Sequence, residues 1–584
     1  MSLSLDTFGA SPVSRWLAGR VWRLEHAFER ARASGRAEDD TRIRIFFVLA
    51  LFAAGFITLA VGATHAALFS DAGKGDGYAT PAGAARADIV DRNGQMLAAD
   101  LLHYGLYIDP REIWDAGETR RALAAALPDV TPDRLERALR SGRRTFLVGG
   151  LTPEARGRVN DLGLPGVSFE PEQRRVYPLG YTAAHLIGFA DSGGEGLAGA
   201  EAALNTDIRS GAAGHGAVPL SIDLRVQAAL EDELYKAVAQ FNPRGAVGVV
   251  VNVHTGEILG MANYPTFDPN QPGKASLDAR LNRAAGALYE MGSTFKGFTV
   301  AAGLDAGVAT PTSTFDARQP FQLGYRTIHD YHATHKILTL VEVFQHSSNI
   351  GTARLAESIG VERLSHYFKA FGLTEPAKVE LVESARPLTP KVWDEDAVAS
   401  TSFGHGMNVS PLTLARAYTG LLNGGKLLPL TIRKLPPGAT VDGPRIVSER
   451  TTETLLQIMR ANVTGGSGKT ANVPGLNVGG KTGTGDKYDP VARGYSHTKQ
   501  VSSFAAVFPT DGPVSAPRYF VLILMDEPHP DKTGADPTGG IVAAPAAGHV
   551  IERIAPFLNV RRRVDTMPFA EIPADPAADT GEEH

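Results

Sequence analysis

The sequence predicts an α/β chain in which an α+β sandwich domain follows a smaller mixed α+β domain and one transmembrane helix. Residues 45–69 contain no Asp, Glu, Lys or Arg. Two β-branched segments around a Thr-Gly turn begin at Gly245, and three apolar segments follow one another near the end of the chain. Helical patterns fill most of 293–460, so we expect a sheet that is begun early, completed late and covered by helices.

Length and composition describe a multidomain globular protein. The 584 residues are enough for two or three domains with substantial cores. A hydrophobic content of 43% and a charged content of 21% are typical of folded domains. The net charge of −5 argues against a nucleic-acid partner. The absence of cysteine excludes disulfides, cysteine nucleophiles and thiolate metal sites.

The apolar run 45–69 predicts a transmembrane helix. As a helix it would measure about 37 Å, more than the roughly 30 Å of a hydrocarbon core. A cleaved signal peptide would not follow 44 other residues, and a buried core helix is the remaining alternative. Because Arg42 and Arg44 flank its N-terminal end, the positive-inside rule predicts a cytoplasmic tail over 1–44 and export of everything after the helix. We therefore expect a single-pass protein of the cytoplasmic (inner) membrane.

The exported part divides at a change of pattern. Residues 70–85 are small and predict a linker. Residues 86–240 predict a mixed domain, with a strand, a tight turn at Asn93-Gly94, a second strand, an Arg-rich helical stretch over 113–160 and a closing helix. The second domain, 245–560, opens with a hairpin and ends with a helix over 543–557. The acidic and Pro-containing segment 561–584 predicts a disordered tail.

Two Ser-x-x-Lys sequences compete as a nucleophile and its base, Ser293–Lys296 and Ser496–Lys499. A serine nucleophile is well placed at a helix N-terminus, where free N–H groups can stabilise an oxyanion and a lysine one turn later shares its face. Ser293 precedes an amphipathic segment, whereas Ser496 lies in a stretch interrupted by proline and glycine, which predicts a polar loop. Ser293 is therefore the predicted nucleophile, although a capping serine beside a surface lysine would leave the same pattern.

Further basic and hydroxyl groups are needed near such a pair. A lysine deprotonates serine only if its pKa falls from about 10.4, so a second basic group and a proton relay are expected. Ser347–Asn349 supplies a Ser-x-Asn in a helical context, and Lys481–Thr484 supplies Lys-Thr-Gly-Thr on a predicted strand. A second Lys-Thr-Gly begins at Lys532, but the prolines around it predict a loop.

Ser-x-x-Lys, Ser-x-Asn and Lys-Thr-Gly, each on the element that its chemistry needs, resemble the motifs of the penicillin-binding proteins. These serine DD-peptidases share their fold with the serine β-lactamases. The segments NRAAGALYEMGSTFK, FGHGMNVSPLTLARAYTGLLNGG and GGIVAAPAAGHVIERI are also similar to family segments. The resemblance covers roughly residues 86–558. Met291 stands where the family usually has proline, a departure that concerns the turn into the helix.

The resemblance implies the roles of the catalytic residues. Ser293 would attack the carbonyl between two D-alanines of a peptidoglycan stem peptide, while Lys296 takes its proton. Ser347 would pass a proton to the leaving amine, with Lys481 beside it keeping the local field positive. Asn349 would hydrogen-bond the backbone of the substrate.

The resemblance also implies how substrate is bound. Thr482 and Thr484 would bind the terminal carboxylate or its β-lactam mimic, and Gly483 would let the peptide lie against the strand edge. The backbone N–H groups of the nucleophile and of Thr484 would form the oxyanion hole. This chemistry needs no metal and no cofactor, and His332 and His335 are interpreted as surface residues.

The N-terminal half resembles the pedestal, or dimerisation-type domain, of the class B enzymes. A single anchor, RADIVDRNG and GLAGAE carry this resemblance, and the segment before the second domain is too short for the glycosyltransferase domain of class A. Five pedestal residues are expected to serve packing and partner contacts rather than catalysis: Arg86, Asp91, Arg92, Asn93 and Glu201.

Within class B, the resemblance is to the septal, FtsI-like type. This interpretation rests on the segment RRVYPLGYTAAHLIGFADSGGEGLAGAE and on KTGTGDKY, in which no Ala-Gln follows the Lys-Thr-Gly-Thr motif. It implies a β-lactam-inhibited D,D-transpeptidase at the division septum, with an FtsW-type glycan polymerase and other divisome membrane proteins as partners. An elongation-specific class B transpeptidase is the alternative. A membrane-anchored β-lactam sensor or β-lactamase is a more distant one.

Overall fold

The structure is a computed structural model that describes residues 86–211, 216–323, 325–489 and 494–569, with a few isolated positions before residue 60. The chain divides into two compact units, Met1–Ala79 and Thr80–His584. Most of the predicted cytoplasmic tail and transmembrane segment, the whole linker 70–85 and the tail beyond 569 lie outside the described residues. Among the described residues, no helix combines the length and the apolar character needed to cross a membrane.

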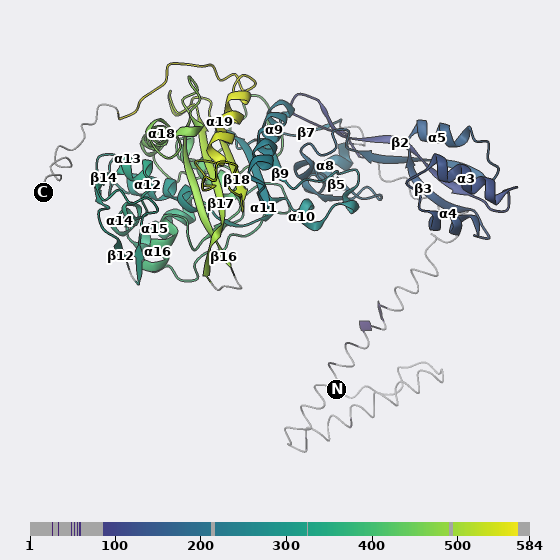
Figure 1. Cartoon of the computed structure of the whole chain (residues 1–584), viewed down its shortest axis with the longest axis horizontal. Coiled ribbons are helices and arrows are strands. Elements are labelled where there is room, and N and C mark those ends of the chain that lie inside the picture. The colour runs from purple at the N-terminus through teal and green to yellow at the C-terminus, as the bar shows by residue number, and fades with distance from the viewer. Residues whose placement is uncertain are drawn as a thin grey trace, which may run out of the picture. The chain divides into compact units, whose positions relative to one another are not determined.

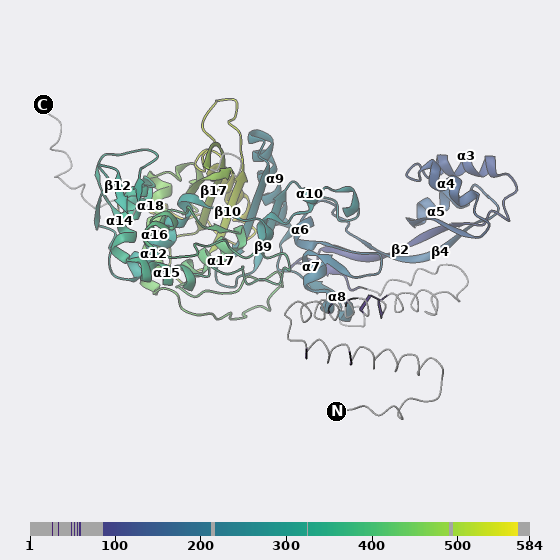
Figure 2. The same ribbon diagram turned by 90° about the horizontal axis from the view of Figure 1, so that it is seen from below.

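A five-stranded sheet organises the pedestal. Its order is β3 (Thr145–Leu151), β2 (Met96–Ile108), β1 (Ile89–Val90) and β7 (Val218–Pro219), and β4 (Val167–Val176) pairs with β2. The predicted strand, turn and strand are confirmed, because β1 (Ile89–Val90) and β2 (Met96–Ile108) flank Gly94. Gly94 has a φ of +86°, which glycine adopts without strain. The long antiparallel pair of β2 and β4 (Val167–Val176) connects a helical lobe to the elements around α7 and α8, as Figures 1 and 2 show.

The lobe at the far end of β2 has a small core of its own. Helices α3 (Ala116–Ala126), α4 (Pro132–Leu139) and α5 (Pro153–Asn160) pack with β2 and β3 (Thr145–Leu151). The prediction of helix throughout 113–160 is therefore wrong at β3. Its short run of threonine, phenylalanine, leucine and valine has no helical spacing and pairs with β2 instead.

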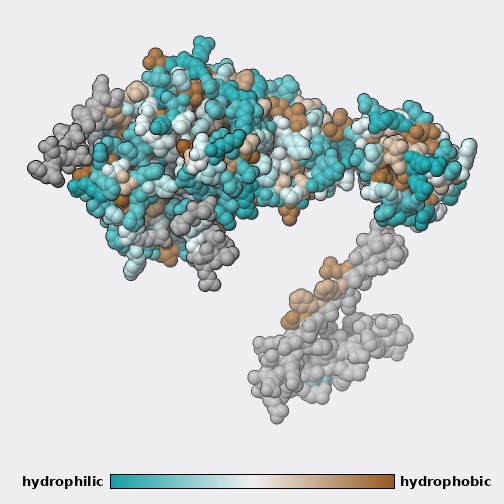
Figure 3. Space-filling view, in the orientation of Figure 1, coloured by the Kyte–Doolittle hydropathy of each residue, from teal (hydrophilic) through white to brown (hydrophobic). Residues whose placement is uncertain are grey.

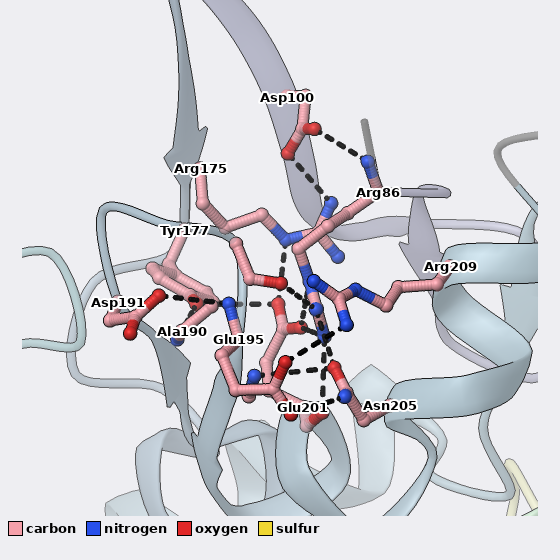
Figure 4. Close-up of polar contacts among 12 residues, drawn as sticks. Arg86, Asp100, Arg175, Tyr177, Ala190, Asp191, Glu195, Glu201, Asn205 and Arg209 are labelled. Atoms are coloured by element: carbon pink, nitrogen blue, oxygen red, sulfur yellow. Dashed lines mark hydrogen bonds and ion pairs between the residues drawn. The ribbon is translucent and has the colours of Figure 1, made fainter. Parts of the chain in front are cut away.

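A buried ion-pair network joins the pedestal strands to α7 (Gly199–Ala203) (Figure 4). The carboxylate of Glu201 accepts from Arg86 Nε at 2.9 Å and from Arg175 Nε at 2.6 Å. Arg175 also contacts Asp100 at 3.2 Å. Because the side chains of Arg86 and Glu201 are 1% and 0% exposed, removing Glu201 would leave the buried guanidinium of Arg86 without its carboxylate, at a cost of about 3–5 kcal/mol. This geometry fits the packing role expected of both residues.

The turn between β1 and β2 packs against the second domain. Asp91 accepts backbone N–H groups of Asn93 and Gln95 at 2.8 Å each, and that of Leu224 at 3.1 Å. Arg92 lies 3.7 Å from the carboxylate of Glu257. Helix α9 (Leu224–Phe241), which the sequence predicts as the closing helix of the pedestal 86–240, instead packs on the sheet of the second domain. It begins at a side chain of the pedestal, Asp91.

The second domain is built on a five-stranded antiparallel sheet in the order β16-β17-β18-β8-β9. The predicted hairpin is β8 (Gly245–Asn252) with β9 (Ile258–Tyr264). The three predicted apolar strands are β16 (Gly479–Asp489), β17 (Gly494–Phe508) and β18 (Tyr519–Asp526). Because β18 pairs with β8, the sheet begun early is completed late, as predicted, and β16 is left at one edge.

Helices cover both faces of this sheet (Figure 1). On one face pack α9 (Leu224–Phe241) and α19 (Ala543–Ile554), which shares its start with the predicted helix 543–557. On the other lie α12 (Lys296–Asp305), α17 (Pro411–Leu422) and α18 (Glu449–Gly465). Alternate residues of β8 belong to the two cores, which is the period of two expected of a strand buried on both faces.

The other elements are short or lie among the helices of the second face. In chain order they are α6 (Ala184–Ile187), β5 (Phe189–Ala190), β6 (Gly196–Ala198), α8 (Asn205–Ser210), β7 (Val218–Pro219), α10 (Leu277–Arg280), α11 (Arg283–Gly286), β10 (Tyr289–Glu290), β11 (Thr314–Asp316), β12 (Phe321–Leu323), β13 (Arg326–Ile328), β14 (Ile337–Thr339), α13 (Leu340–Gln345), α14 (Asn349–Ile359), α15 (Val361–Ala370), α16 (Glu395–Ser402) and β15 (Asn408–Val409). The strands between 314 and 339 interrupt a stretch that the sequence predicts as mostly helical.

The face drawn in Figure 3 is predominantly hydrophilic over both domains. Its apolar residues occur singly or in small groups, which is ordinary for a protein surface.

Residues 561–569 differ from the predicted disordered tail, because they lie along the second domain. The side chain of Arg460, which is 1% exposed, donates to the carbonyl of Thr566 at 3.1 Å and pairs with Asp565 at 3.4 Å. Asn477 Oδ1 accepts the N–H of Thr566 at 2.7 Å. We call residues 561–569 the C-terminal strap. The composition of this segment gave no sign of the buried arginine that it covers.

Candidate active site

Ser293 lies in a 3-10 turn, Gly292–Phe295, that runs directly into α12. The predicted helix start is therefore confirmed. Met291, which stands where the family usually has proline, has a φ of −83°, close to the range that proline imposes. Its side chain is fully buried, and its carbonyl accepts the hydroxyl of Thr294 at 2.8 Å. The turn thus forms without a proline.

Two glycines allow this turn to lie in direct contact with β16. At Gly292, whose φ is +52°, a Cβ would lie 2.3 Å from the carbonyl oxygen of Thr484. At Gly483 it would lie 2.6 Å from the carbonyl oxygen of Met291 and 2.4 Å from Ser503 Oγ. No side chain fits at these distances, so the two backbones touch. The space that a side chain would need at Gly483 is therefore filled by the nucleophile turn and by β17.

Tyr418 of α17 supports the other side of the turn. Its hydroxyl donates to the carbonyl of Thr294 at 2.6 Å. A Cβ on Gly297 would lie 2.3 Å from that hydroxyl oxygen. Complete burial raises the pKa of Tyr418 far above its usual value, so the hydroxyl stays a donor. The sequence analysis missed Tyr418, because its partners Thr294 and Gly297 lie far from it along the chain.

Two buried lysines converge on the hydroxyl of Ser347. Lys296 Nζ lies 3.1 Å and Lys481 Nζ lies 2.9 Å from Ser347 Oγ. Lys296 also donates to Asn349 Oδ1 at 2.8 Å and to the carbonyl of Ser347. Four of the predicted catalytic residues are therefore in direct contact.

The fifth, Ser293, is half-buried one turn before Lys296 and stands outside this network. Among the described residues its hydroxyl makes no hydrogen bond, so the Ser293–Lys296 contact that the resemblance implies is not formed. The reason is that the amine of Lys296 is turned toward Ser347 and Asn349.

The lowered pKa values of Lys296 and Lys481 supply a base near neutral pH. Burial lowers the pKa of Lys296 to about 7, against the opposing effect of Asp330. Burial lowers the pKa of Lys481 well below its usual value, and the neighbouring Lys296 lowers it further. Two ammonium groups on one hydroxyl in a buried site repel each other. At neutral pH and above, at least one amine of the pair is therefore neutral, as a general base requires.

Ser347 occupies the break between α13 and α14, not the helix that its context predicts. Its φ of +57° is a left-handed conformation, which costs a non-glycine residue about 1–2 kcal/mol. Ser348, the next residue, caps α14 by accepting the N–H of Gly351 at 2.9 Å. The strained backbone at Ser347 is therefore held from both sides by helices.

Thr482 and Thr484 stand on the same face of β16. Thr482 Oγ1 lies 2.8 Å from Ser467 Oγ and 3.2 Å from Lys481 Nζ. Thr484 Oγ1 accepts the N–H of Gly539 at 3.2 Å. Both threonines lie on the strand that carries Lys481. Ser467 was missed by the sequence analysis because it belongs to no motif.

The competing motifs have other surroundings. Ser496 lies in β17, so the predicted polar loop is wrong there, because the hairpin of β16 and β17 continues to the pair Asp489↔Gly494. Ser496 nevertheless begins no helix, and its hydroxyl accepts the N–H of Lys499 at 3.0 Å. Lys532 is exposed in a loop, as predicted.

His332 and His335 are exposed, as expected of surface residues. Within the described residues there is no group of three or more His, Cys, Asp or Glu side chains that could hold a metal ion.

Comparisons with known proteins match both domains. Residues 246–552 match the penicillin-binding protein transpeptidase domain, and residues 81–206 match the penicillin-binding protein dimerisation domain. The chain is 64% identical over 588 residues to a probable peptidoglycan D,D-transpeptidase FtsI of Caulobacter vibrioides, covering 99% of this chain and 100% of that protein. It is 31% identical to the peptidoglycan D,D-transpeptidase FtsI of Escherichia coli, covering 81% and 84%.

A solved structure is also similar. Penicillin-binding protein 3 of Mycobacterium tuberculosis, complexed with aztreonam, superposes with a TM-score of 0.62 at 26% identity, covering 82% of this chain and 98% of that one. The dimerisation domain precedes the transpeptidase domain along the chain. Each domain matches its own family model, and the Caulobacter vibrioides protein matches the two domains in one alignment. The protein therefore belongs to the class B penicillin-binding proteins.

Proposed function

We propose that the protein is a peptidoglycan D,D-transpeptidase that cross-links stem peptides through an acyl-enzyme on Ser293. One observation carries this proposal. The hydroxyl of Ser347 lies within 3.1 Å of two buried amines, Lys296 and Lys481, one of which follows Ser293 by a single turn. The chain that holds this arrangement is 64% identical to a probable peptidoglycan D,D-transpeptidase.

The first half of the reaction forms the acyl-enzyme. Ser293 Oγ attacks the carbonyl carbon between the two D-alanines, and its proton passes to the neutral amine of Lys296, which must turn from Ser347 and Asn349 toward Ser293 for this step. The N–H groups of Ser293 and Thr484 would hold the oxyanion, since the Gly292 contact brings these two segments together. When the C–N bond breaks, Ser347 gives its proton to the leaving D-alanine amine, and the lysine pair returns one to Ser347.

The second half transfers the acyl group. The amine of an acceptor stem peptide attacks the ester carbonyl, the C–Oγ bond breaks, and Ser293 recovers a proton from the amine through the same network. Thr482 and Thr484 would bind the terminal carboxylate of the donor, and Asn349 its backbone. A β-lactam would acylate the same serine, and its leaving nitrogen stays tethered, so the ester would persist.

We further propose that the enzyme works at the division septum, anchored by the helix over 45–69. In this arrangement residues 1–44 are cytoplasmic, and the linker 70–85, pedestal 86–240 and catalytic domain 245–560 lie outside the membrane. The pedestal sequence, which resembles the septal type, supports this choice over the elongation type. An FtsW-type polymerase held through the anchor would present new glycan strands at high effective concentration. The small residues 53–55 offer a helix-packing face for it.

Covalent labelling with a fluorescent penicillin tests the nucleophile. The wild type should be labelled, Ser293→Ala should not, and Ser496→Ala should be labelled normally. The matched pair Lys481→Ala and Lys532→Ala should respectively abolish and preserve labelling. Label that survives Ser293→Ala and disappears in Ser496→Ala would reverse the assignment.

The lifetime of the label separates the remaining classes. A transpeptidase should keep its acyl group for minutes or longer, whereas an anchored β-lactamase would release it rapidly. A sensor would be labelled but would not cross-link stem peptides in vitro. Depletion in cells addresses the septal role: we expect smooth filaments with stalled septa, and widened cells that still divide would assign the enzyme to elongation.

A further inference from the structure

Helix α14, which carries Asn349, begins against a carboxylate from a separate segment. Asp330 follows β13, and its Oδ2 accepts the hydroxyl of Ser348 at 2.8 Å. Its Oδ1 accepts the backbone N–H of Ile350 at 2.9 Å. Since Ser348 itself caps the helix, α14 has two capping side chains. Free N–H groups and the helix dipole both favour a negative charge at this place.

The residue before Asp330 completes this contact. The carbonyl of His329 accepts Asn349 Nδ2 at 3.0 Å, which leaves Asn349 Oδ1 to accept from Lys296 at 2.8 Å. Residues 329 and 330 therefore hydrogen-bond to three consecutive residues, 348 to 350. These follow directly after Ser347, whose left-handed backbone needs such external support.

Asp330 is also the negative charge that acts on Lys296. It raises the pKa of Lys296, in the direction opposite to burial. Of the other groups packed around this lysine, β16 contributes the cation Lys481, and Ser347 and Asn349 are not ionised. Helix α18 turns its buried Arg460 toward Asp565. Tyr418 of α17 stays protonated, because burial raises its pKa.

We propose that Asp330 is a positioning residue for acyl transfer: it fixes Ser347 and Asn349 against the lysine pair and supplies the negative charge that Lys296 faces. This inference rests on the proposed function, in which Lys296 is the base. A carboxylate near an amine favours its protonated form. Removing the charge should therefore free the amine of its proton at lower pH, and the acid limb of the rate profile should move the same way.

Asp330→Asn tests the charge with little change of shape. The amide oxygen can still accept one of the two hydrogen bonds, so the plateau rate of acylation by a fluorescent penicillin should fall by less than about tenfold. The acid limb of the pH–rate profile should move to lower pH by about half a unit or more. Asp330→Ala removes both bonds, so it should show the same displacement with a plateau lowered by more than about tenfold. If Asp330→Ala fails to fold, Asp330→Asn alone carries the test.

Asp394→Asn is the matched control. Asp394 caps α16 by accepting the N–H of Ala397 at 2.8 Å, and it contacts neither lysine. The acid limb of the pH–rate profile of Asp394→Asn should coincide with that of the wild type. An unmoved limb in Asp330→Asn, or an equal displacement in Asp394→Asn, overturns the proposal. A wild type that is not labelled at any pH would instead refute the proposed function, so the two failures are distinguishable.

Discussion

At the scale of single residues, Ser347 combines a strained backbone with a hydroxyl shared by two amines. Its left-handed φ of +57° costs free energy that a glycine would not incur. Its Oγ lies 3.1 Å from Lys296 Nζ and 2.9 Å from Lys481 Nζ. The proton transfer proposed for this hydroxyl would account for serine rather than glycine at this position.

The substitutions Ser347→Ala and Ser347→Gly separate these two properties. Both remove the hydroxyl, so both should lower the acylation rate by about 10²-fold or more, in the range of a lost catalytic proton transfer. Only Ser347→Gly relieves the left-handed strain. Its free energy of unfolding should therefore be about 1 kcal/mol larger than that of Ser347→Ala. Penicillin labelling and thermal melting of the two variants measure the effects. Equal melting temperatures would show that the backbone at 347 is not strained.

At the scale of elements, the site depends on direct contact between the nucleophile turn and β16. A Cβ at Gly483 would lie within 2.6 Å of two atoms, one on the turn and one on β17. Either the turn or the strand must therefore shift when a side chain is added. A shift at this point would displace Ser293 from Lys481 and Thr484, because both lie on the same strand as Gly483.

Gly483→Ala should abolish labelling, while Gly534→Ala should preserve it. Gly534 belongs to the exposed Lys-Thr-Gly, and a Cβ there meets nothing within 4 Å. Its φ of +73° makes the control demanding, since the substitution brings strain of about 1–2 kcal/mol without a clash. Labelling rates of the two purified variants compare the effects. Normal labelling of Gly483→Ala would show that the turn and the strand need not touch.

The sequence predicts an element or a site residue when the signal lies within a few neighbouring residues, and misses it when the cause is a contact with a distant segment. The three motifs were found because each is a short spacing with its own chemistry. Asp330, Tyr418 and Ser467 were missed because their partners lie far away in the sequence. Strand β3 was missed because seven residues are too few to show a period. The large sheet was found because its central strands β8 and β18 are almost entirely apolar.

At the scale of the whole molecule, the C-terminal strap contacts a buried arginine that in turn supports the start of β16. Arg460 donates to the carbonyl of Val478 at 3.0 Å, immediately before β16, and its charge is paired by Asp565 of the strap. Without the strap this arginine would lose its carboxylate partner and the carbonyl of Thr566. The position of β16, and with it Lys481, would then be less firmly held.

Two truncations test this support. A chain ending at residue 569 should melt and label like the wild type. A chain ending at residue 560 should lose about 1–3 kcal/mol of stability, from the hydrogen bonds and the ion pair at Arg460, and should label more slowly. Thermal melting and labelling rates report the two effects. If the shorter chain labels at the rate of the longer one, the strap has no part in placing β16.

The strand order of the large sheet also fixes which strands a growing chain must contain before the sheet can close. The hairpin of β8 and β9 leaves the ribosome well before β18, its only other neighbour in the sheet, and β16 with Lys481 is reached through β17. Until β18 emerges, β8 therefore keeps an open edge that could pair with other chains. Ser293 and Lys481 come together only after the intervening helices are complete. A chain interrupted anywhere before β18 therefore cannot close the sheet that carries Lys481.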